Sequence, residues 1–435
     1  MSLREKPPHN VVPLNATTND IFHARMAPFS LNSTARGLIT LYTSTVMAGM
    51  WTMIVPTIPV LANNFSITPG TAAQLITALS VGRFAGMPIS GWLLDRFGAP
   101  TALVAGPLMA CLAAILAAVT PWFALILIPV FLIGIADSIW VIAREIAGVD
   151  LVRSDQRGRV LSGFHGVNYL GFAFGPLIGG LLTVQLGFRA VFIAYAACAA
   201  TSALLGWSVE SRNHAAAPQR NTTVVHGWTL PAMRRRLHGI KELFYQITPE
   251  LRATYIVLVL ATFTSFAHRI TTQSIVPIFA SSTLGMTPQE VGLLFTISGL
   301  SVFIMILPAG FVIDKVGRKW ATVPSTGIPA IAFLLIPFSE SFLQLAILLS
   351  FLGISNGLSL GSLATSTYDV VPAAARGRLQ AARRTIAEIG GISAPLFGGL
   401  LADKFNPGVP FLAYAPLLIV SAILLAIVGR ETLQK

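Results

Sequence analysis

The polar residues that could do chemistry lie within long apolar stretches of the chain. A charged side chain in such a stretch is costly to place in lipid and by default indicates a functional site. Asp137 is the leading candidate for proton coupling, because burial disfavours a charged carboxylate while a nearby cation favours it. Arg83, Arg269 and His268 would then attract an anionic group. The predicted substrate-binding or proton-coupling residues are Asp137, Arg83, Arg269, His268, Arg144, Glu145, Asn356, Gln273, Asn168 and Glu388.

A purely structural role is the alternative for two of the three carboxylates in this set, Asp137 and Glu388. Asp137 could form a buried ion pair with Arg83, or with Arg144, which lies seven residues on and on the same face of a helix. Glu388 could likewise pair with Arg384, four residues before it. The sequence leaves both possibilities open.

The composition places these residues in a membrane protein. Of the 435 residues, 54% are hydrophobic and 11% are charged, and the mean hydropathy is +0.73, whereas soluble domains have about 25% charged residues. Apolar stretches are long enough to cross a hydrocarbon core of about 30 Å as helices, and they lack the alternation of a transmembrane β-barrel. The cysteines Cys111 and Cys198 lack metal-ligand spacing, so we expect no metal and no cofactor. The twelve predicted spans are 37–62, 71–94, 99–119, 122–148, 160–185, 188–209, 251–279, 290–313, 319–338, 342–366, 380–402 and 409–429.

The basic residues gather on one side of this topology. With the N-terminus in the cytoplasm, 24 of the 29 Lys and Arg residues fall in cytoplasmic segments, and the opposite side has only Arg189 and Lys404. Such an excess is typical of cytoplasmic loops. The net charge of +12 therefore indicates orientation in a lipid bilayer and not a nucleic-acid partner. We expect both termini in the cytoplasm and the protein in the plasma (inner) membrane.

One long polar segment divides the chain into two sets of six spans. Within it, apolar residues recur at helical spacing beside Arg234, Arg235 and Arg236. This pattern suits a helix on the anionic leaflet or, equally, a partly ordered basic linker. The predicted organisation is a cytoplasmic tail (1–36), an N-terminal six-helix bundle (37–209), a cytoplasmic linker (210–250), a C-terminal six-helix bundle (251–430) and a cytoplasmic tail (431–435).

The two sets of spans are related by an internal repeat at one offset, 219 residues. We therefore predict an all-α membrane protein with twelve transmembrane helices in two homologous six-helix bundles. Parallel repeats of this kind place a binding site between the bundles near the bilayer midplane. The matched residues are Gly91, Asp95 and Gly98 with Gly310, Asp314 and Gly317; Asp150, Arg157, Gly158 and Arg159 with Asp369, Arg376, Gly377 and Arg378; and Pro176, Gly179 and Gly180 with Pro395, Gly398 and Gly399.

The first of these repeated segments, Gly91-Trp-Leu-Leu-Asp95-Arg96-Phe-Gly98, resembles the signature loop of the major facilitator superfamily. A second copy, which begins at Gly310, matches more fully. The resemblance covers about residues 37–430 and implies that these loops gate the cytoplasmic side, because glycine permits close helix approach and a carboxylate can bind arginine or a helix N-terminus. The expected gating residues are Gly91, Asp95, Arg96, Gly98, Asp314, Lys315, Gly317, Arg318, Arg157, Arg376, Gly175 and Pro176.

Two further segments resemble the drug/proton antiporter branch of this superfamily. They are Gly171-Phe-Ala-Phe-Gly175-Pro176-Leu-Ile-Gly179-Gly180 and Pro56-Thr57-Ile58-Pro59, although Val130 stands where the branch has an arginine. The resemblance implies a proton-coupled exporter of small organic molecules. Because Arg83 and Arg269 exceed what Asp137 would neutralise, we expect the substrate to be amphipathic or anionic. The loops contain no nucleotide-binding loop or nucleophile–base spacing, so we do not expect an enzyme, and we expect a monomer. The spans at 99–119, 188–209, 319–338 and 409–429 would be peripheral. The alternatives are proton-coupled import of an organic anion or sugar, and transport of lysolipids.

Overall fold

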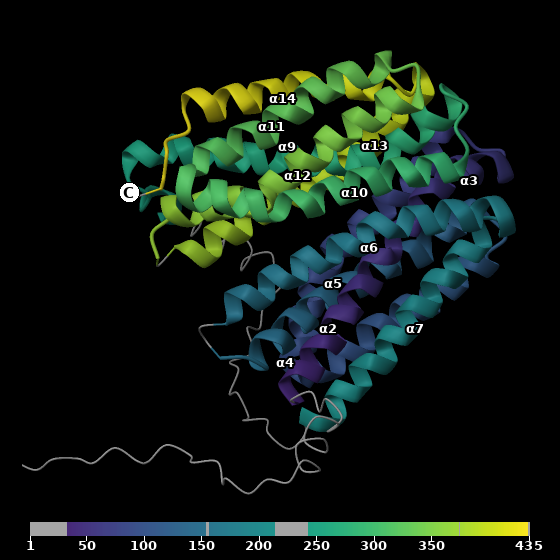
Figure 1. The fold of residues 1–435 in the computed structure, drawn as a ribbon, viewed down its shortest axis with the longest axis horizontal. Coiled ribbons are helices and arrows are strands. Elements are labelled where there is room, and N and C mark those ends of the chain that lie inside the picture. Colours follow the sequence, from purple (N-terminus) through teal and green to yellow (C-terminus); the bar gives the residue numbers. More distant parts are fainter. Residues whose placement is uncertain (1–32, 154–155, 214–241, 374, 434–435) are drawn as a thin grey trace, which may run out of the picture.

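The structure is a computed structural model that describes residues 33–153, 156–213, 242–373 and 375–433. The described chain is helical and forms two bundles, here called the N-half and the C-half (Figure 1). The N-half contains α2 (Ser33–Gly49), η1 (Met50–Thr57), α3 (Ile58–Asn64), α4 (Pro69–Val119), α5 (Phe123–Asp150), α6 (Arg157–Leu186) and α7 (Phe188–Asn213). The C-half contains α9 (Pro249–Ser282), α10 (Pro288–Phe311), η2 (Val312–Val316), α11 (Arg318–Leu335), η3 (Ile336–Phe338), α12 (Phe342–Val370), α13 (Arg376–Lys404) and α14 (Val409–Ile427).

Eleven helical segments of the described chain are long and apolar enough to cross a membrane. One of them, α4, has 51 residues and contains two helices merged across a kink at Gly98. Gly98 has a φ of +81°, a left-handed conformation that glycine adopts without a steric penalty. This division of α4 accounts for all twelve predicted spans and confirms the all-α membrane fold.

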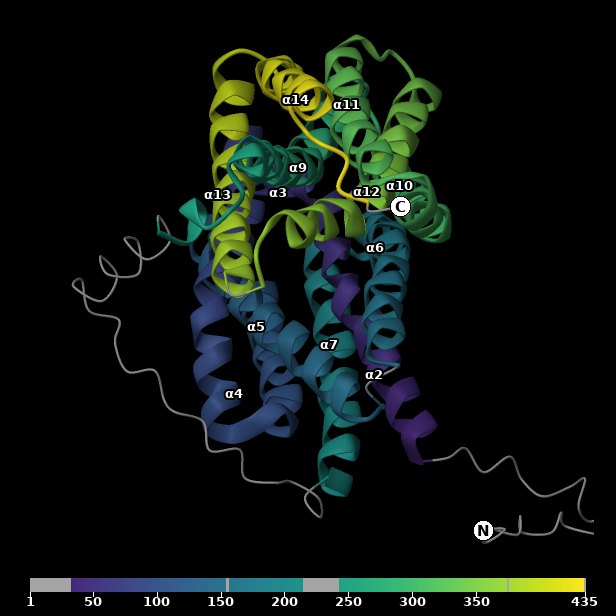
Figure 2. The same ribbon diagram turned by 90° about the vertical axis from the view of Figure 1, so that its left-hand side faces the viewer.

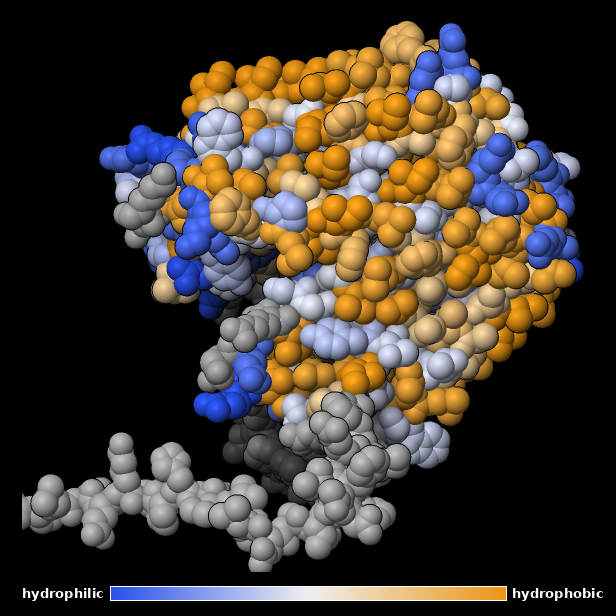
Figure 3. Space-filling model, viewed as in Figure 1, coloured by the Kyte–Doolittle hydropathy of each residue, from blue (hydrophilic) through white to orange (hydrophobic). Residues whose placement is uncertain are grey.

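The outer surface of both halves is apolar along the flanks of the helices. Figure 3 shows hydrophobic residues over the middle of the visible face and hydrophilic residues gathered at its two ends. Large side chains such as Leu307 (84% exposed) and Ile427 (77% exposed) project from this surface. An apolar belt of this extent matches the hydrocarbon core of a bilayer.

The halves converge at the end of the molecule near α3 and separate at the end where the C-terminus lies (Figure 1). Two helix pairs provide most of the contact between them: α13 contacts α4 on one flank and α10 contacts α6 on the other (Figure 2). At the first crossing, a Cβ atom added to Gly399 would lie 2.6 Å from the carbonyl oxygen of Gly70. At the second, a Cβ on Gly180 would overlap the backbone of Pro288. Both crossings therefore bring backbone against backbone and close this end.

The helix α6 contacts both halves through different faces. Gly175 and Gly179 face η1 inside the N-half, where a Cβ atom would overlap Thr52 and the backbone of Met53. Pro176 faces α10 of the C-half, since its carbonyl oxygen lies against Gly292. Of the predicted gating residues Gly175 and Pro176, Pro176 thus lies at the boundary between the halves and Gly175 does not.

The described end of the predicted linker packs on the C-half. Residues 242–245 are helical, and Leu243 and Ile247 are buried in a cluster with Tyr255 and Leu258. The rest of the predicted amphipathic segment, including its arginines, lies outside the described residues.

Candidate functional site

A cavity of about 490 Å³ lies between the two halves. Its walls come from η1, α4 and α6 of the N-half and from α9, α10, α12 and α13 of the C-half. Within the described chain, α7, α11 and α14 add nothing to this lining, as the resemblance implied for peripheral spans. Because the halves touch at the end near α3, the cavity is closed there. Figure 3 shows the surface hollowed between the halves at the opposite end.

Arg83 and Asp137 form an ion pair at the N-half wall. Arg83 Nε donates to Asp137 Oδ2 over 2.8 Å, and the hydroxyl of Ser138 donates to the carbonyl oxygen of Arg83 over 2.7 Å. The Arg83 guanidinium also lies 4.4 Å from the ring centroid of Trp51, a cation–π arrangement. Of the two structural pairings considered for Asp137, the one with Arg83 is therefore present in this conformation.

Arg144 lies behind this pair and is nearly fully buried, at 4% exposed. Its Nε and Nη1 atoms have no hydrogen-bond partner among the described residues, and neither does the hydroxyl of Tyr195. Asp137, Glu145 and Tyr195 act on this guanidinium electrostatically. Asp137 thus faces two arginines and is hydrogen-bonded to one of them.

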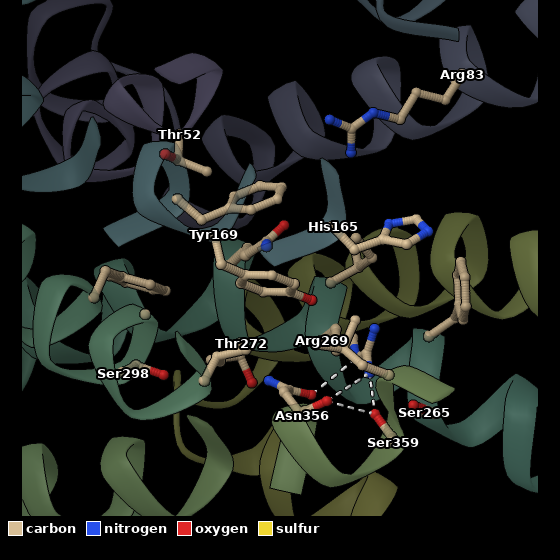
Figure 4. A pocket seen from close by; sticks show the side chains of 18 of the residues that line it. Thr52, Arg83, His165, Tyr169, Ser265, Arg269, Thr272, Ser298, Asn356 and Ser359 are labelled. Atoms are coloured by element: carbon tan, nitrogen blue, oxygen red, sulfur yellow. Dashed lines mark hydrogen bonds between the residues drawn. The ribbon is translucent and has the colours of Figure 1, made fainter. Parts of the chain in front are cut away.

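Arg269 projects into the cavity from the opposite wall (Figure 4). Its Nε donates to Asn356 Oδ1 over 2.8 Å, and its Nη2 donates to the Ser359 hydroxyl and, over 3.4 Å, to the Asn356 carbonyl oxygen. His268 is buried behind it, with Nε2 3.1 Å from the same Asn356 Oδ1. Three predicted site residues, Arg269, Asn356 and His268, therefore form one cluster.

Two more arginines line the cavity from α13. Arg383 donates from Nη1 to Thr262 Oγ1 over 3.0 Å and from Nε to Gln380 Oε1 over 2.9 Å. Arg384 forms a 2.8 Å ion pair with Glu388, which is the pairing that the four-residue spacing predicted. Arg383 falls at the start of the predicted span 380–402 but was counted with the basic residues of the cytoplasmic side, because the residues around it are hydrophilic, so it was not predicted to line the cavity.

The other predicted binding residues are less closely associated with the cavity. Gln273 lines it, and its buried Oε1 has no partner among the described residues. His165 and Tyr169 of α6 also line it. The predicted residues that are not among the lining residues are Asp137, Arg144, Glu145, Asn168, His268 and Glu388, of which Asp137 and Glu388 reach the cavity only through their pairing with Arg83 and Arg384. No group of His, Cys, Asp and Glu residues in the described ranges could hold a metal ion.

The gating loop of the C-half forms a closed polar network. Arg318 bonds Asp314 over 2.9 Å and Asp369 over 3.2 Å. The carboxylate of Glu431 accepts the backbone N–H groups of Arg318 (2.8 Å) and Lys319 (3.1 Å) at the start of α11, where the helix dipole favours a negative charge. Burial acts to raise the pKa of Glu431, but these and two further backbone N–H donors outweigh it and lower the pKa.

The equivalent loop of the N-half is not joined in this way. The Asp95 carboxylate has no hydrogen bond or ion pair to another described residue, and the Arg96 guanidinium lies beside the rings of Trp92 and Phe97 at 5.9 and 5.6 Å. A Cβ at Gly91 would meet no atom within 4 Å, and the same holds at Gly310. Of the other predicted gating residues, Lys315 is exposed, Arg376 Nε is buried without a partner among the described residues, and the Arg157 side chain lies outside the described part.

The closed end of the cavity has a polar contact that the sequence analysis did not identify. Asp403, near the end of α13, accepts the backbone N–H of Gly70 over 2.7 Å and the hydroxyl of Thr68 over 2.6 Å. Thr68 is the N-cap residue of α4. A carboxylate of the C-half therefore binds a helix N-terminus of the N-half.

Comparisons with known proteins agree with this architecture. A family model described as Major Facilitator Superfamily matches residues 40–248 and 258–435. Multidrug resistance protein 2 of Bacillus subtilis is 21% identical over 380 residues, covering 87% of this chain and 91% of that protein. The multi-drug resistance efflux pump PmrA of Streptococcus pneumoniae is 25% identical over 377 residues, covering 83% and 88%. A crystal structure of the peptide transporter POT in complex with sulfate has the same fold, with a TM-score of 0.71 at 16% identity over 90% of this chain and 93% of that one. The chain therefore belongs to the Major Facilitator Superfamily, whose members are multi-pass membrane transporters and not enzymes, as its two copies of the signature loop predicted.

Proposed function

We propose that the protein exports small amphipathic or anionic organic molecules by proton-coupled alternating access. The observation that best supports this proposal is the cavity between the halves. It is lined by arginines held in ion pairs, by polar side chains such as Gln273 that lack a partner among the described residues, and by aromatic side chains. The names of the relatives, multidrug resistance and efflux pumps, favour export. The distribution of Lys and Arg would place the open end of the cavity and both termini in the cytoplasm, with the protein in the plasma (inner) membrane.

Alternating access would follow from the way the halves meet. The crossings of α13 with α4 and of α10 with α6 close one end, so the substrate would enter from the other. Rocking one half against the other would separate these crossings and bring the two gating loops together. The open space around Gly91 and Gly310 leaves room for that approach.

The Arg83–Asp137 pair is the proposed coupling element. A proton on Asp137 would weaken the pair and release Arg83. A cationic substrate group would compete with the proton for Asp137, which couples the two in opposite directions. An anionic group that bound the released Arg83 would instead move in the same direction as the proton, so export of an anion by proton exchange requires that its charge binds away from Arg83. The sign of the coupling therefore depends on which partner of the pair the substrate replaces.

Proton-coupled import of an organic anion is the second candidate function. The lining favours it in one respect, because the arginines of the cavity outnumber the carboxylates that pair with them. Direction of transport separates this candidate from export, and one experiment measures both direction and coupling.

The test uses the purified protein in liposomes with an imposed pH gradient and a clamped membrane potential. Three probes share one aromatic body: naphthalenesulfonate, naphthylmethanol and naphthylmethyl-trimethylammonium. Exchange for protons predicts accumulation of a probe in the acidic compartment, and cotransport predicts accumulation in the alkaline one. Uptake that ignores the gradient, measured against protein-free liposomes, would reject proton coupling.

One variant and one control test whether proton coupling depends on the Arg83–Asp137 pair. Asp137→Asn keeps the size of the side chain but cannot carry a negative charge, so we expect probe transport to lose its response to pH. Arg189→Gln removes an exposed charge outside the cavity and serves as the control. Wild-type coupling in Asp137→Asn would remove Asp137 from the mechanism.

A further inference from the structure

We propose that Arg269 and Arg383 form a binding site for the negatively charged group of the substrate, which makes the substrate class an organic anion with an aromatic or apolar body. This inference rests on the proposed function only in taking the cavity as the substrate site. The proposed site consists of residues of the C-half, whereas the Arg83–Asp137 coupling pair belongs to the N-half.

The first argument is the chemistry of the groups that hold Arg269. Its three hydrogen bonds go to the amide oxygen of Asn356, the backbone carbonyl of Asn356 and the hydroxyl of Ser359. All three acceptors are neutral, so they orient the guanidinium without compensating its charge. They also use only Nε and Nη2, which leaves Nη1 for a ligand. A fixed, planar guanidinium of this kind is suited to carboxylate, sulfonate or phosphate.

Arg383 repeats this arrangement closer to the open end of the cavity. Its hydrogen-bond acceptors, Thr262 Oγ1 and Gln380 Oε1, are again neutral. Thr262 lies two helical turns before Arg269 on α9, which corresponds to about 10 Å along the helix. Because α9 begins at the open end, an anion that enters would meet Arg383 before it reaches Arg269.

The remaining arginines of the cavity provide the contrast. Arg83 is paired with Asp137, and Arg384 is paired with Glu388. Among the described lining residues, the uncompensated guanidinium charge therefore belongs to Arg269 and Arg383, both in the C-half. An unpaired cation in a low-dielectric site is unfavourable, and an anionic ligand would remove this penalty.

The opposite wall offers a surface for an apolar body. Trp51 and Phe172 lie with ring centroids 5.9 Å apart, and Tyr169 and Phe172 with centroids 5.3 Å apart. Figure 4 shows Tyr169 extending from the N-half wall into the space between Arg83 and Arg269. A substrate held by its charge on the C-half and by its ring on the N-half would contact both halves at once.

Binding to the purified full-length protein tests this site, by titration calorimetry with the same naphthalene probes. We expect naphthalenesulfonate to bind at least about tenfold more tightly than naphthylmethanol, as one charge-assisted hydrogen bond permits. Arg269→Gln should weaken sulfonate binding by about tenfold or more and leave naphthylmethanol unchanged. Arg383→Gln should weaken sulfonate binding in the same selective way but less, and Arg269→Lys should retain part of it. Arg189→Gln, which removes an equal charge outside the cavity, should bind as the wild type does.

Several results would overturn the site. They are equal affinity for the sulfonate and the alcohol, tighter binding of the trimethylammonium probe, no sulfonate binding at millimolar concentration, and equal losses for both probes in Arg269→Gln. If Arg269→Gln does not fold, Arg383→Gln decides by the same comparison. Selective sulfonate binding without any pH-driven transport would instead refute the proposed function and leave the site standing.

Discussion

The contact between Asp403 and the N-terminus of α4 predicts that one carboxylate biases the protein toward the conformation described here. Asp403 belongs to the C-half, and its partners Gly70 and Thr68 belong to the N-half. The contact must break when this end of the cavity opens. Asp403→Asn removes the charge but keeps one oxygen that can accept a hydrogen bond. We therefore expect this variant to shift the population toward the conformation that is open at this end.

The magnitude follows from the chemistry and the exposure of the contact. A hydrogen bond to a charged group contributes about 1.5–3 kcal/mol, and a charge at a helix N-terminus about 0.3–1 kcal/mol. Asp403 is exposed, so solvent screening reduces both contributions. A net loss of about 1 kcal/mol corresponds to a change of about fivefold in the ratio of the two conformations.

Spin labels at the closed end can measure this ratio. Asn64 and Glu340 are exposed there on opposite halves, so Asn64→Cys and Glu340→Cys, with Cys111 and Cys198 replaced by alanine, provide two labelling sites. Electron–electron double resonance should show more of the long distance in Asp403→Asn. Lys404→Gln is the matched control, because it changes the charge of the neighbouring residue, whose ammonium lies beside Phe405 at 5.6 Å. A distance distribution that Asp403→Asn leaves unchanged, or changes no more than the control does, would refute the reasoning.

Three further predictions concern stability and the second contact between α13 and α4. Arg144→Met should raise the midpoint of thermal unfolding if the cost of burying a guanidinium whose Nε and Nη1 lack hydrogen-bond partners among the described residues exceeds its attraction to Asp137 and Glu145; a lower midpoint would show that the attraction to these carboxylates is the larger contribution. Glu431→Gln should lower the free energy of unfolding by about 0.5–1 kcal/mol at pH 7, after allowance for the exposure of the side chain. Because the pKa of Glu431 is lowered, its contribution to the free energy of unfolding is complete above about pH 4.3 and is lost as the pH falls through the lowered value. Wild type and variant should therefore have the same unfolding midpoint in acid and different midpoints at neutral pH. Gly399→Ala should destabilise the closed end and lengthen the spin-label distance, whereas Gly377→Ala on the same helix, where a Cβ meets no atom within 4 Å, should do neither.

Hydropathy and the repeat were sufficient to predict the architecture. The twelve spans follow from segment length, and the two halves follow from identities at one spacing. The structure also shows which helices cross between the halves, and the spacing of residues along the sequence does not encode this. Gly180 and Gly399 are repeat equivalents in sequence, and both lie at such a crossing, α6 with α10 and α13 with α4.

The candidate site was predictable where a charge interrupts an apolar run. Arg83, Asp137 and Arg269 were found in this way, and Glu388 was matched correctly with Arg384 because their spacing is local. Arg383 was missed for a physical reason: the cavity extends to the ends of the helices, where the sequence is already hydrophilic and a lining residue looks like a loop residue.

Asp403 was missed for a different reason. Its partners are 333 and 335 residues away in the chain, and its position near the end of a span is typical of any solvated acidic residue. A contact of this kind depends on the relative placement of two independent bundles, which periodicity within one helix does not encode.

The capping of α4 and α10 has a consequence for how the closed end comes apart. Thr68 and Thr287 begin these helices at equivalent positions of the repeat. The carboxylate beside Thr287 is that of Glu290 in the same helix, which accepts the Thr287 backbone N–H over 2.8 Å, whereas the carboxylate beside Thr68 comes from across the boundary. Among the described residues, α10 and α6 can therefore separate without losing a hydrogen bond to a charged group, whereas α13 and α4 cannot. We expect the first gap at the closed end to appear beside α10, while the contact between Asp403 and the start of α4 still holds.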